Sequence, residues 1–196
     1  MRKNSVLKTI NPLVLAPFAE PNLCSDSAIA LIDSSIDDCT HLIRGISPGT
    51  EIVLLDRDRN AIIQIAEILN QYPAFASVHL ISHGSPGCLN LGNVQLNSHT
   101  LPGYTSILQA WFPSSSQQES ILVLYGCEVA LGKEGQNFLK QLSDILGIEI
   151  IASSQRVGNP EFGGSWNFDW KTGKQTIYPI FSETFKQTYP GVFATI

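Results

Sequence analysis

The chain has 196 residues, which is enough for one domain with a hydrophobic core and too few for two domains of ordinary size. Its formal net charge is -5 and its lysines and arginines form no cluster, so no nucleic-acid partner is expected. Every apolar stretch is interrupted before the roughly 20 residues that a membrane span requires. Composition therefore predicts a soluble single domain without a membrane span.

The two ends of the chain lack a regular pattern. Residues 1–27 are interpreted as an N-terminal arm: early positive charges and apolar residues resemble an export signal, but Pro12 and Pro17 interrupt the apolar run. The aromatic residues between 181 and 196 show no usable period, and this segment is interpreted as a C-terminal tail. The expected domain covers residues 28–180.

The cysteines bear on the cellular setting. They are scattered without the spacing of a disulfide framework: Cys24, Cys39, Cys88 and Cys127. A reduced, cytoplasmic setting is therefore expected, with export or attachment to the cell surface as the alternative.

Strands and helices are expected to alternate as far as residue 152, because short apolar runs are followed by segments whose apolar residues have helical spacing. The expected strands cover residues 27–33, 51–55, 78–82, 121–125 and 149–152. The expected helices cover residues 34–44, 60–71 and 100–112, and a fourth ends at Gly147. This alternation predicts an α/β fold with a mostly parallel sheet and helices on both faces.

Two hairpins complete the expected fold. Residues 88–96 surround Gly92-Asn93, the composition of a two-residue turn, and would form a small flap beside His83. Residues 166–170 and 175–178 predict a C-terminal antiparallel hairpin, with the alternating aromatic residues of its first strand packed on one side.

The stretch around Cys127 is the centre of the functional argument. Residues 121–125 form an apolar run that is too short for a helix, as expected of a strand buried on both faces, and Cys127 follows it. His83 follows the strand of residues 78–82 in the same way, although it lies 44 positions earlier. Chemistry gathers at the carboxyl ends of parallel strands, so the two residues are expected to meet above one solvent-accessible groove.

A catalytic cysteine needs a base that generates its thiolate and donors for the oxyanion formed on attack. Cys127 is the candidate nucleophile, and His83 is the candidate base that generates its thiolate. Gly84 and Gly126 allow the backbone to approach a substrate carbonyl closely, with the N–H groups of Gly84 and Cys127 as candidate oxyanion donors. The pattern favours catalysis, and a buried structural cysteine at position 127 is the alternative.

The motifs at these corners carry a resemblance. The chain contains VHLISHGSPG, then ILVLYGCEVALGKEGQNFL, then IEIIASSQRVG. These motifs resemble the caspase-like clan of cysteine peptidases, which includes caspases, gingipains, clostripain, separase and CHAT domains. In that clan one apolar strand ends in His-Gly and a later one in Ala-Cys or Gly-Cys.

Within the clan, the chain is most similar to an uncharacterised domain family attached to large bacterial adhesin-type surface proteins. The residues that carry this similarity are Ile32-Asp33, Leu55-Asp56, Gln64-Ile65-Ala66, Ser82 to Ser85, Tyr125 to Cys127 and Gly163 to Trp166. The resemblance implies a caspase-like three-layer sandwich and a cysteine endopeptidase that acts on a protein or peptide, including itself. His83 would be the general base or acid and Cys127 the nucleophile, without a cofactor.

The resemblance also suggests residues for substrate binding. The candidates at the same sheet edge are Asp33, Ser82, Tyr125, Glu128, Ser153 and Ser154. Tyr125 stands where relatives with a basic P1 preference carry an Asp, so that preference is not implied. Asp33 could supply the missing charge from the end of the first strand.

Other functions were weighed against the peptidase. The glycines form no dinucleotide fingerprint, no P-loop is present, and neither Cys127 nor Ser85 has the flanking glycines of a nucleophile elbow. A metal site built from His79, His83 and Cys88 is an alternative, but a single HxxxH on a strand is a weak zinc signature, so no metal is expected. The remaining alternative is a catalytically silent module for peptide binding or assembly. The sequence leaves the oligomeric state open.

Overall fold

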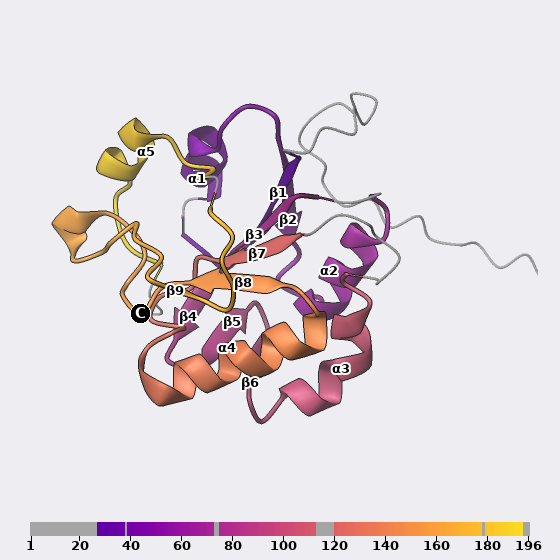
Figure 1. Ribbon diagram of the computed structural model, residues 1–196. Helices are drawn as coiled ribbons and strands as arrows, with labels where there is room; N and C mark the ends of the chain where they lie inside the picture. The colour runs from indigo at the N-terminus through magenta and orange to yellow at the C-terminus, as the bar shows by residue number, and fades with distance from the viewer. Residues whose placement is uncertain (1–26, 38, 73–74, 113–119, 178, 194–196) are drawn as a thin grey trace, which may run out of the picture.

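The computed structural model describes residues 27–37, 39–72, 75–112, 120–177 and 179–193 (Figure 1). Within them, a six-stranded sheet has the order β2-β1-β3-β7-β8-β9, and only β8 and β9 pair antiparallel. Its strands are β1 (Ala28–Asp33), β2 (Thr50–Leu55), β3 (Ser77–Ile81), β7 (Ile121–Leu124), β8 (Glu149–Ala152) and β9 (Trp170–Lys171). The predicted α/β fold with a mostly parallel sheet is confirmed.

Helices cover both faces of this sheet and give three layers (Figure 1). One face carries α2 (Ala61–Leu69), α3 (Leu101–Gln109) and α4 (Gly132–Leu146), and the other carries α1 (Cys39–Gly45) and α5 (Glu183–Thr188). A short 3-10 helix covers Pro160–Phe162. No helix among the described residues is long and apolar enough to cross a bilayer.

Side-chain alternation along the strands divides the core in two. On β7, Leu122 and Leu124 belong to the cluster under α2–α4, whereas Ile121 and Val123 belong to the cluster under α1 and α5. All are 2 % exposed or less, as expected of a strand buried on both faces. The same alternation places Tyr125 and Cys127 in the second cluster.

A second, antiparallel sheet contains β4 (His83–Ser85), β5 (Cys88–Leu91) and β6 (Val94–Asn97). The predicted hairpin around Gly92-Asn93 is confirmed as β5–β6. We expected a loop after His83, but residues 83–85 form a short strand in which His83 pairs with Asn90. The glycines after His83 let the chain turn away from the main sheet and then pair with the flap.

The predicted C-terminal hairpin is wrong within the described residues. β9 does not pair with residues 175–177 but with the free edge of β8. Thr172 extends that pairing, because its N–H donates to the oxygen of Ile150 at 3.0 Å and its hydroxyl accepts from the Ile150 N–H at 2.8 Å. The partner segment's last residue, Tyr178, lies outside the described residues.

The segment from Phe181 onward is not a loose tail as far as residue 193. Phe181, Phe185, Tyr189 and Phe193 are each at most 6 % exposed and belong to the second cluster of the core. They recur every four residues, a period that the sequence analysis overlooked. Packing therefore continues past the expected boundary at residue 180. Almost all of the expected N-terminal arm lies outside the described residues.

Candidate active site

His83 and Cys127 follow two strands that are direct neighbours, as expected. β3 and β7 pair in parallel with Leu80 opposite Leu124. His83 follows the end of β3 by two residues and Cys127 follows the end of β7 by three, so both lie at the same edge of the main sheet. Cys127 belongs to the cluster on the face that carries α1 and α5, and His83 meets the same cluster through the main-chain oxygen of Phe193.

Two glycines bring these corners into contact. A Cβ atom added to Gly84 would lie 2.8 Å from the Cα of Gly126 and 2.6 Å from the side chain of Val129. A Cβ atom added to Gly126 would lie 3.3 Å from the Cα of Gly84. The backbone of the histidine corner therefore touches that of the cysteine corner, and only glycine fits at position 84.

The Cys127 thiol is covered, which contradicts the expectation that it opens onto a solvent-accessible groove. The residue is 1 % exposed. Its Sγ donates to the main-chain oxygen of Val157 at 3.6 Å and accepts from the Val157 N–H at 3.2 Å. Burial raises the pKa of the Cys127 thiol to about 11, and these main-chain contacts only partly oppose it.

His83 differs from Cys127 because it is only half-buried. Its Nδ1 lies 3.4 Å from the main-chain oxygen of Phe193, at the end of the C-terminal segment. It also lines an open pocket of about 710 Å³, which we call the flap pocket. The flap pocket is lined by Ser35, His83, Asn90, Gly92, Asn93, Val94, Gln95, Thr100 and Tyr104. The expected flap beside His83 is thus present.

The Asp33 carboxylate is used inside the fold. The residue is 1 % exposed, and its two oxygens accept hydrogen bonds from the N–H groups of Ser35 at 2.9 Å and Gly92 at 2.7 Å. These bonds tie the end of β1 to the flap turn. Because only 1 % of Asp33 is exposed, a substrate cation has no open path to its carboxylate, and the residue does not fit the proposed role as a receptor for a basic P1 side chain.

Three other substrate-binding candidates are also internal. Ser82, Tyr125 and Ser153 are at most 2 % exposed. The Tyr125 ring packs edge-on against Phe168 and Phe181, with centroids 4.9 and 5.5 Å apart. Burial raises the pKa of Tyr125 well above its usual value. These residues support the site from within and offer no surface to a substrate.

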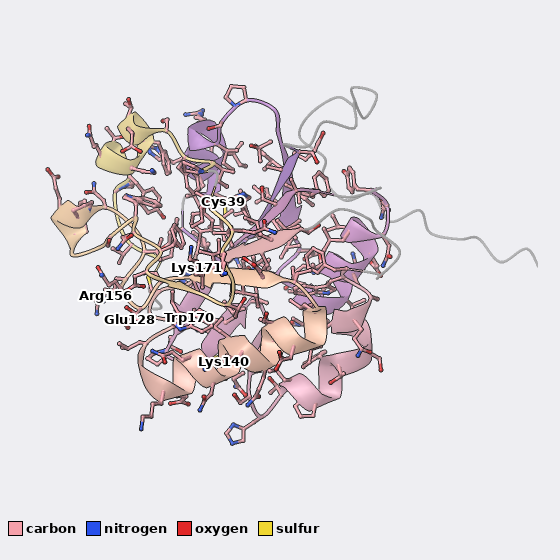
Figure 2. All side chains as sticks on the ribbon, in the orientation of Figure 1. Cys39, Glu128, Lys140, Arg156, Trp170 and Lys171 are labelled. Atoms are coloured by element: carbon pink, nitrogen blue, oxygen red, sulfur yellow. The ribbon has the colours of Figure 1, made fainter. Side chains whose placement is uncertain are left out.

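Glu128 and Ser154 lie nearer the surface. Glu128 has a left-handed backbone with φ of 58°, and its N–H donates to the oxygen of Gln155 at 2.9 Å. Ser154 is held by the Asp169 carboxylate through both its N–H and its hydroxyl. Figure 2 shows Glu128 and Arg156 at one edge of the molecule, and their charges act on the pKa of Cys127 in opposite directions.

The alternative metal site is not supported. His79 is fully buried, with Nδ1 3.1 Å from the Tyr125 hydroxyl and Nε2 3.0 Å from the Ser77 hydroxyl. Both ring nitrogens are therefore engaged within the protein. Among the described residues, no group of three His, Cys, Asp or Glu side chains could hold a metal ion.

Sequence reasoning missed the two residues that cover the dyad. Val157 contacts the Cys127 thiol from the loop after β8, and Phe193 reaches His83 from the C-terminal segment. Val157 is an apolar residue, and nothing in the sequence around it indicates a contact with Cys127. Phe193 could have been found, because it is the last member of the four-residue aromatic repeat that starts at Phe181.

The fold and the site define an α/β domain in which a histidine and a cysteine follow two adjacent parallel strands and lie beside the C-terminal segment of the same chain. The chain belongs to the family described as Domain of unknown function (DUF4347), whose model matches residues 29–193. The match includes both corners of the site and the C-terminal segment that packs on them. No curated protein matches the chain.

Proposed function

We propose that this domain is a cysteine endopeptidase acting on a protein or peptide substrate, with Cys127 as the nucleophile and His83 as the general acid and base. One observation carries the proposal. The two residues follow neighbouring parallel strands, and the segment that ends at Phe193 links them: the Phe193 oxygen lies 3.4 Å from His83 Nδ1, and its N–H donates to the Val157 oxygen that contacts the Cys127 thiol. A thiol and an imidazole at neighbouring strand ends, beside one extended peptide segment, are the parts that thiol-based acyl transfer requires.

The proposed reaction balances with these two side chains. The proton of Cys127 passes to His83 as the sulfur adds to the scissile carbonyl carbon. The imidazolium then protonates the leaving amine as the C–N bond breaks, which leaves a thioester. Water attacks the thioester with neutral His83 as base, releases the carboxylate product and restores the thiol. The N–H groups of Gly84 and Cys127 are the proposed oxyanion donors.

The burial and protonation of the Cys127 thiol limit this activity. With a pKa of about 11, the thiol is protonated at neutral pH and is a poor nucleophile. Burial is the largest cause of the shift, so removal of the covering residues would bring the pKa back toward that of an ordinary thiol. The proposed enzyme is therefore silent while Cys127 is covered.

The same burial favours a second candidate function, a peptide-binding or assembly module without turnover. An acyloxymethyl-ketone probe and a mixed peptide library separate the two functions when mass spectrometry reads both the modified cysteine and the peptide fragments. In a Phe193→Ala chain, which lacks one of the covering side chains, the peptidase predicts modification of Cys127 ahead of Cys88, cleaved library peptides, and loss of both when Cys127→Ala is added.

Histidine variants provide the matched control. His83→Ala should lower cleavage at least tenfold, whereas His99→Ala, which removes an exposed histidine, should leave it unchanged. Absence of any cleavage, with equal modification of Cys88 and Cys127, would favour the binding module instead.

A further inference from the structure

The last described residues bind alongside residues 157–159 as an added strand. The N–H of Phe193 donates to the oxygen of Val157 at 2.8 Å, and the N–H of Asn159 donates to the oxygen of Gly191 at 2.9 Å. Gly158 and Val192 form an antiparallel bridge between these contacts. This main-chain pattern is the one by which a strand edge binds an extended peptide.

The added strand carries the peptide group of Phe193 onto the dyad. The Phe193 oxygen lies 3.4 Å from His83 Nδ1. The Phe193 N–H donates to the oxygen of Val157, and the same oxygen accepts from the Cys127 thiol. Figure 1 shows this yellow segment on the sheet face that carries α1. Phe193 thus stands where the residue before the scissile bond of a substrate would stand.

The Phe193 side chain fills an aromatic subsite. It is fully buried, and its ring lies edge-on to Trp166 with centroids 5.8 Å apart and 5.1 Å from the ring of Tyr189. The cluster around it is apolar and includes Val157. An environment of this kind favours a large uncharged ring and penalises a charged side chain.

Neighbouring residues hold the segment without a covalent link. The Asn159 side-chain amide donates to the main-chain oxygens of Gln187 at 3.0 Å and Tyr189 at 2.7 Å. Gly158 permits the close approach, since a Cβ atom there would lie 2.5 Å from the oxygen of Gly191. The contacts that hold the segment in place are hydrogen bonds and aromatic packing, both of which a competing peptide can replace.

We propose that Gly191–Phe193 occupies the substrate cleft in the resting molecule, and that the open cleft takes extended peptides with an aromatic residue at the position of Phe193. This inference rests on the proposed peptidase function and adds its regulation and its substrate class. Displacement of the segment exposes Cys127, and its return closes the site.

The first test measures the rate at which iodoacetamide modifies Cys127 in the 196-residue chain. Phe193→Ala removes the ring and should raise that rate at least tenfold, while the rate at Cys88 stays constant as an internal control for folding. Phe193→Trp, which keeps an aromatic ring, should stay within threefold of the wild type. An unchanged Cys127 rate in a folded Phe193→Ala chain would overturn the inference.

A pair of glycine variants tests the same point without altering Phe193. Gly158→Ala places a methyl group against the segment, whereas a methyl group at Gly191 meets no atom within 4 Å. Gly158→Ala should raise the Cys127 rate and Gly191→Ala should not. If both variants match the wild type, the segment does not control access.

A urea series on the wild-type chain covers the case in which these variants unfold. Displacement of a short segment exposes little surface, so Cys127 modification should depend on urea far less steeply than global unfolding does. Equal slopes would mean that the thiol is reached only by unfolding, and the inference would fail.

The last test adds the segment back as acetyl-Tyr-Pro-Gly-Val-Phe-amide. It should restore protection of Cys127 in Phe193→Ala, whereas a matched peptide ending in Asp should not. This readout needs no catalysis, so protection without cleavage of any peptide supports the inference and contradicts the peptidase. If the wild-type chain cleaves peptides as fast as Phe193→Ala does, the result supports the peptidase and contradicts the inference that the segment closes the site.

Discussion

Nδ1 of His83 lies 3.4 Å from the main-chain oxygen of Phe193, although the two residues are 110 positions apart in the chain. The same segment packs in the cluster that contains Cys127. The covering of the thiol is therefore a product of tertiary packing by the C-terminal segment and the Val157 loop. Neither belongs to the strands that carry the dyad.

The burial of Cys127 predicts a loss of stability at high pH. Its thiol pKa rises from the usual 9.0 to about 11, so the folded state keeps a proton that the unfolded state loses between these values. Stability should therefore fall from pH 9 to 11, by about 2 kcal/mol from this group. Urea unfolding at both pH values should give a smaller fall in Cys127→Ala, and an equal fall in the two chains would contradict the prediction.

His79 should act at the opposite end of the pH range. Burial lowers its pKa from 6.5 to about 3, so the unfolded state binds a proton that the folded state does not. Stability should drop as the pH falls from 6.5 toward 3, with about 4 kcal/mol assigned to this group. Unfolding free energies at pH 7, 5 and 4 should show a weaker acid dependence in His79→Gln. Parallel curves for the two chains would rule out His79 as the cause.

Contact between the two corners predicts different outcomes for two glycine substitutions. In Gly84→Ala the new methyl group would meet Val129 and the backbone of Gly126, which should cost about 1 to 3 kcal/mol and separate His83 from Cys127. Gly103→Ala, in α3, meets nothing within 4 Å and should stabilise the chain by up to about 1 kcal/mol. Thermal unfolding of both variants measures the contrast. Equal stability of the two would show that the corners have room for a side chain.

Asp33 should matter for stability and not for substrate choice. Asp33→Asn turns a group that accepts two hydrogen bonds into one that pairs well with only one, at a cost of about 1 to 3 kcal/mol. Asp37→Asn, at an exposed site, should cost little. Cleavage of matched Arg-, Lys- and Phe-containing peptides should keep the same ranking in Asp33→Asn. A selective loss of the basic peptides would restore the P1 role.

The parallel sheet was predictable because its signals are local. The buried strands around Leu31, Leu80 and Val123 are short and mostly apolar, Asn60 caps its helix with its side chain, and Gly147 ends its helix in a left-handed conformation. The C-terminal hairpin was not predictable from the same signals. Trp170 alternates with polar residues like any strand residue, and only the free edge of β8 decides its partner.

The sequence predicted the two motifs of the site but not how far their side chains are exposed. His83-Gly84 and Gly126-Cys127 stand out because strand ends, glycines and reactive side chains coincide there. Their exposure depends on Val157 and Phe193, which are ordinary apolar residues in the sequence and reach the thiol only through long-range packing. The aromatic repeat ending at Phe193 indicated that the segment packs, but not that it packs on Cys127.

The sheet separates two interiors, and this has a mechanical consequence. The residues that clasp the C-terminal end lie on the side of α1 and α5, whereas α2, α3 and α4 are anchored on the other side by residues such as Phe138 and Leu142. The contacts on the side of α1 and α5 can therefore open while the core under α2, α3 and α4 stays packed. Under the proposed release of Gly191–Phe193, we therefore expect access to the Cys127 sulfur without disruption of the core under α2, α3 and α4.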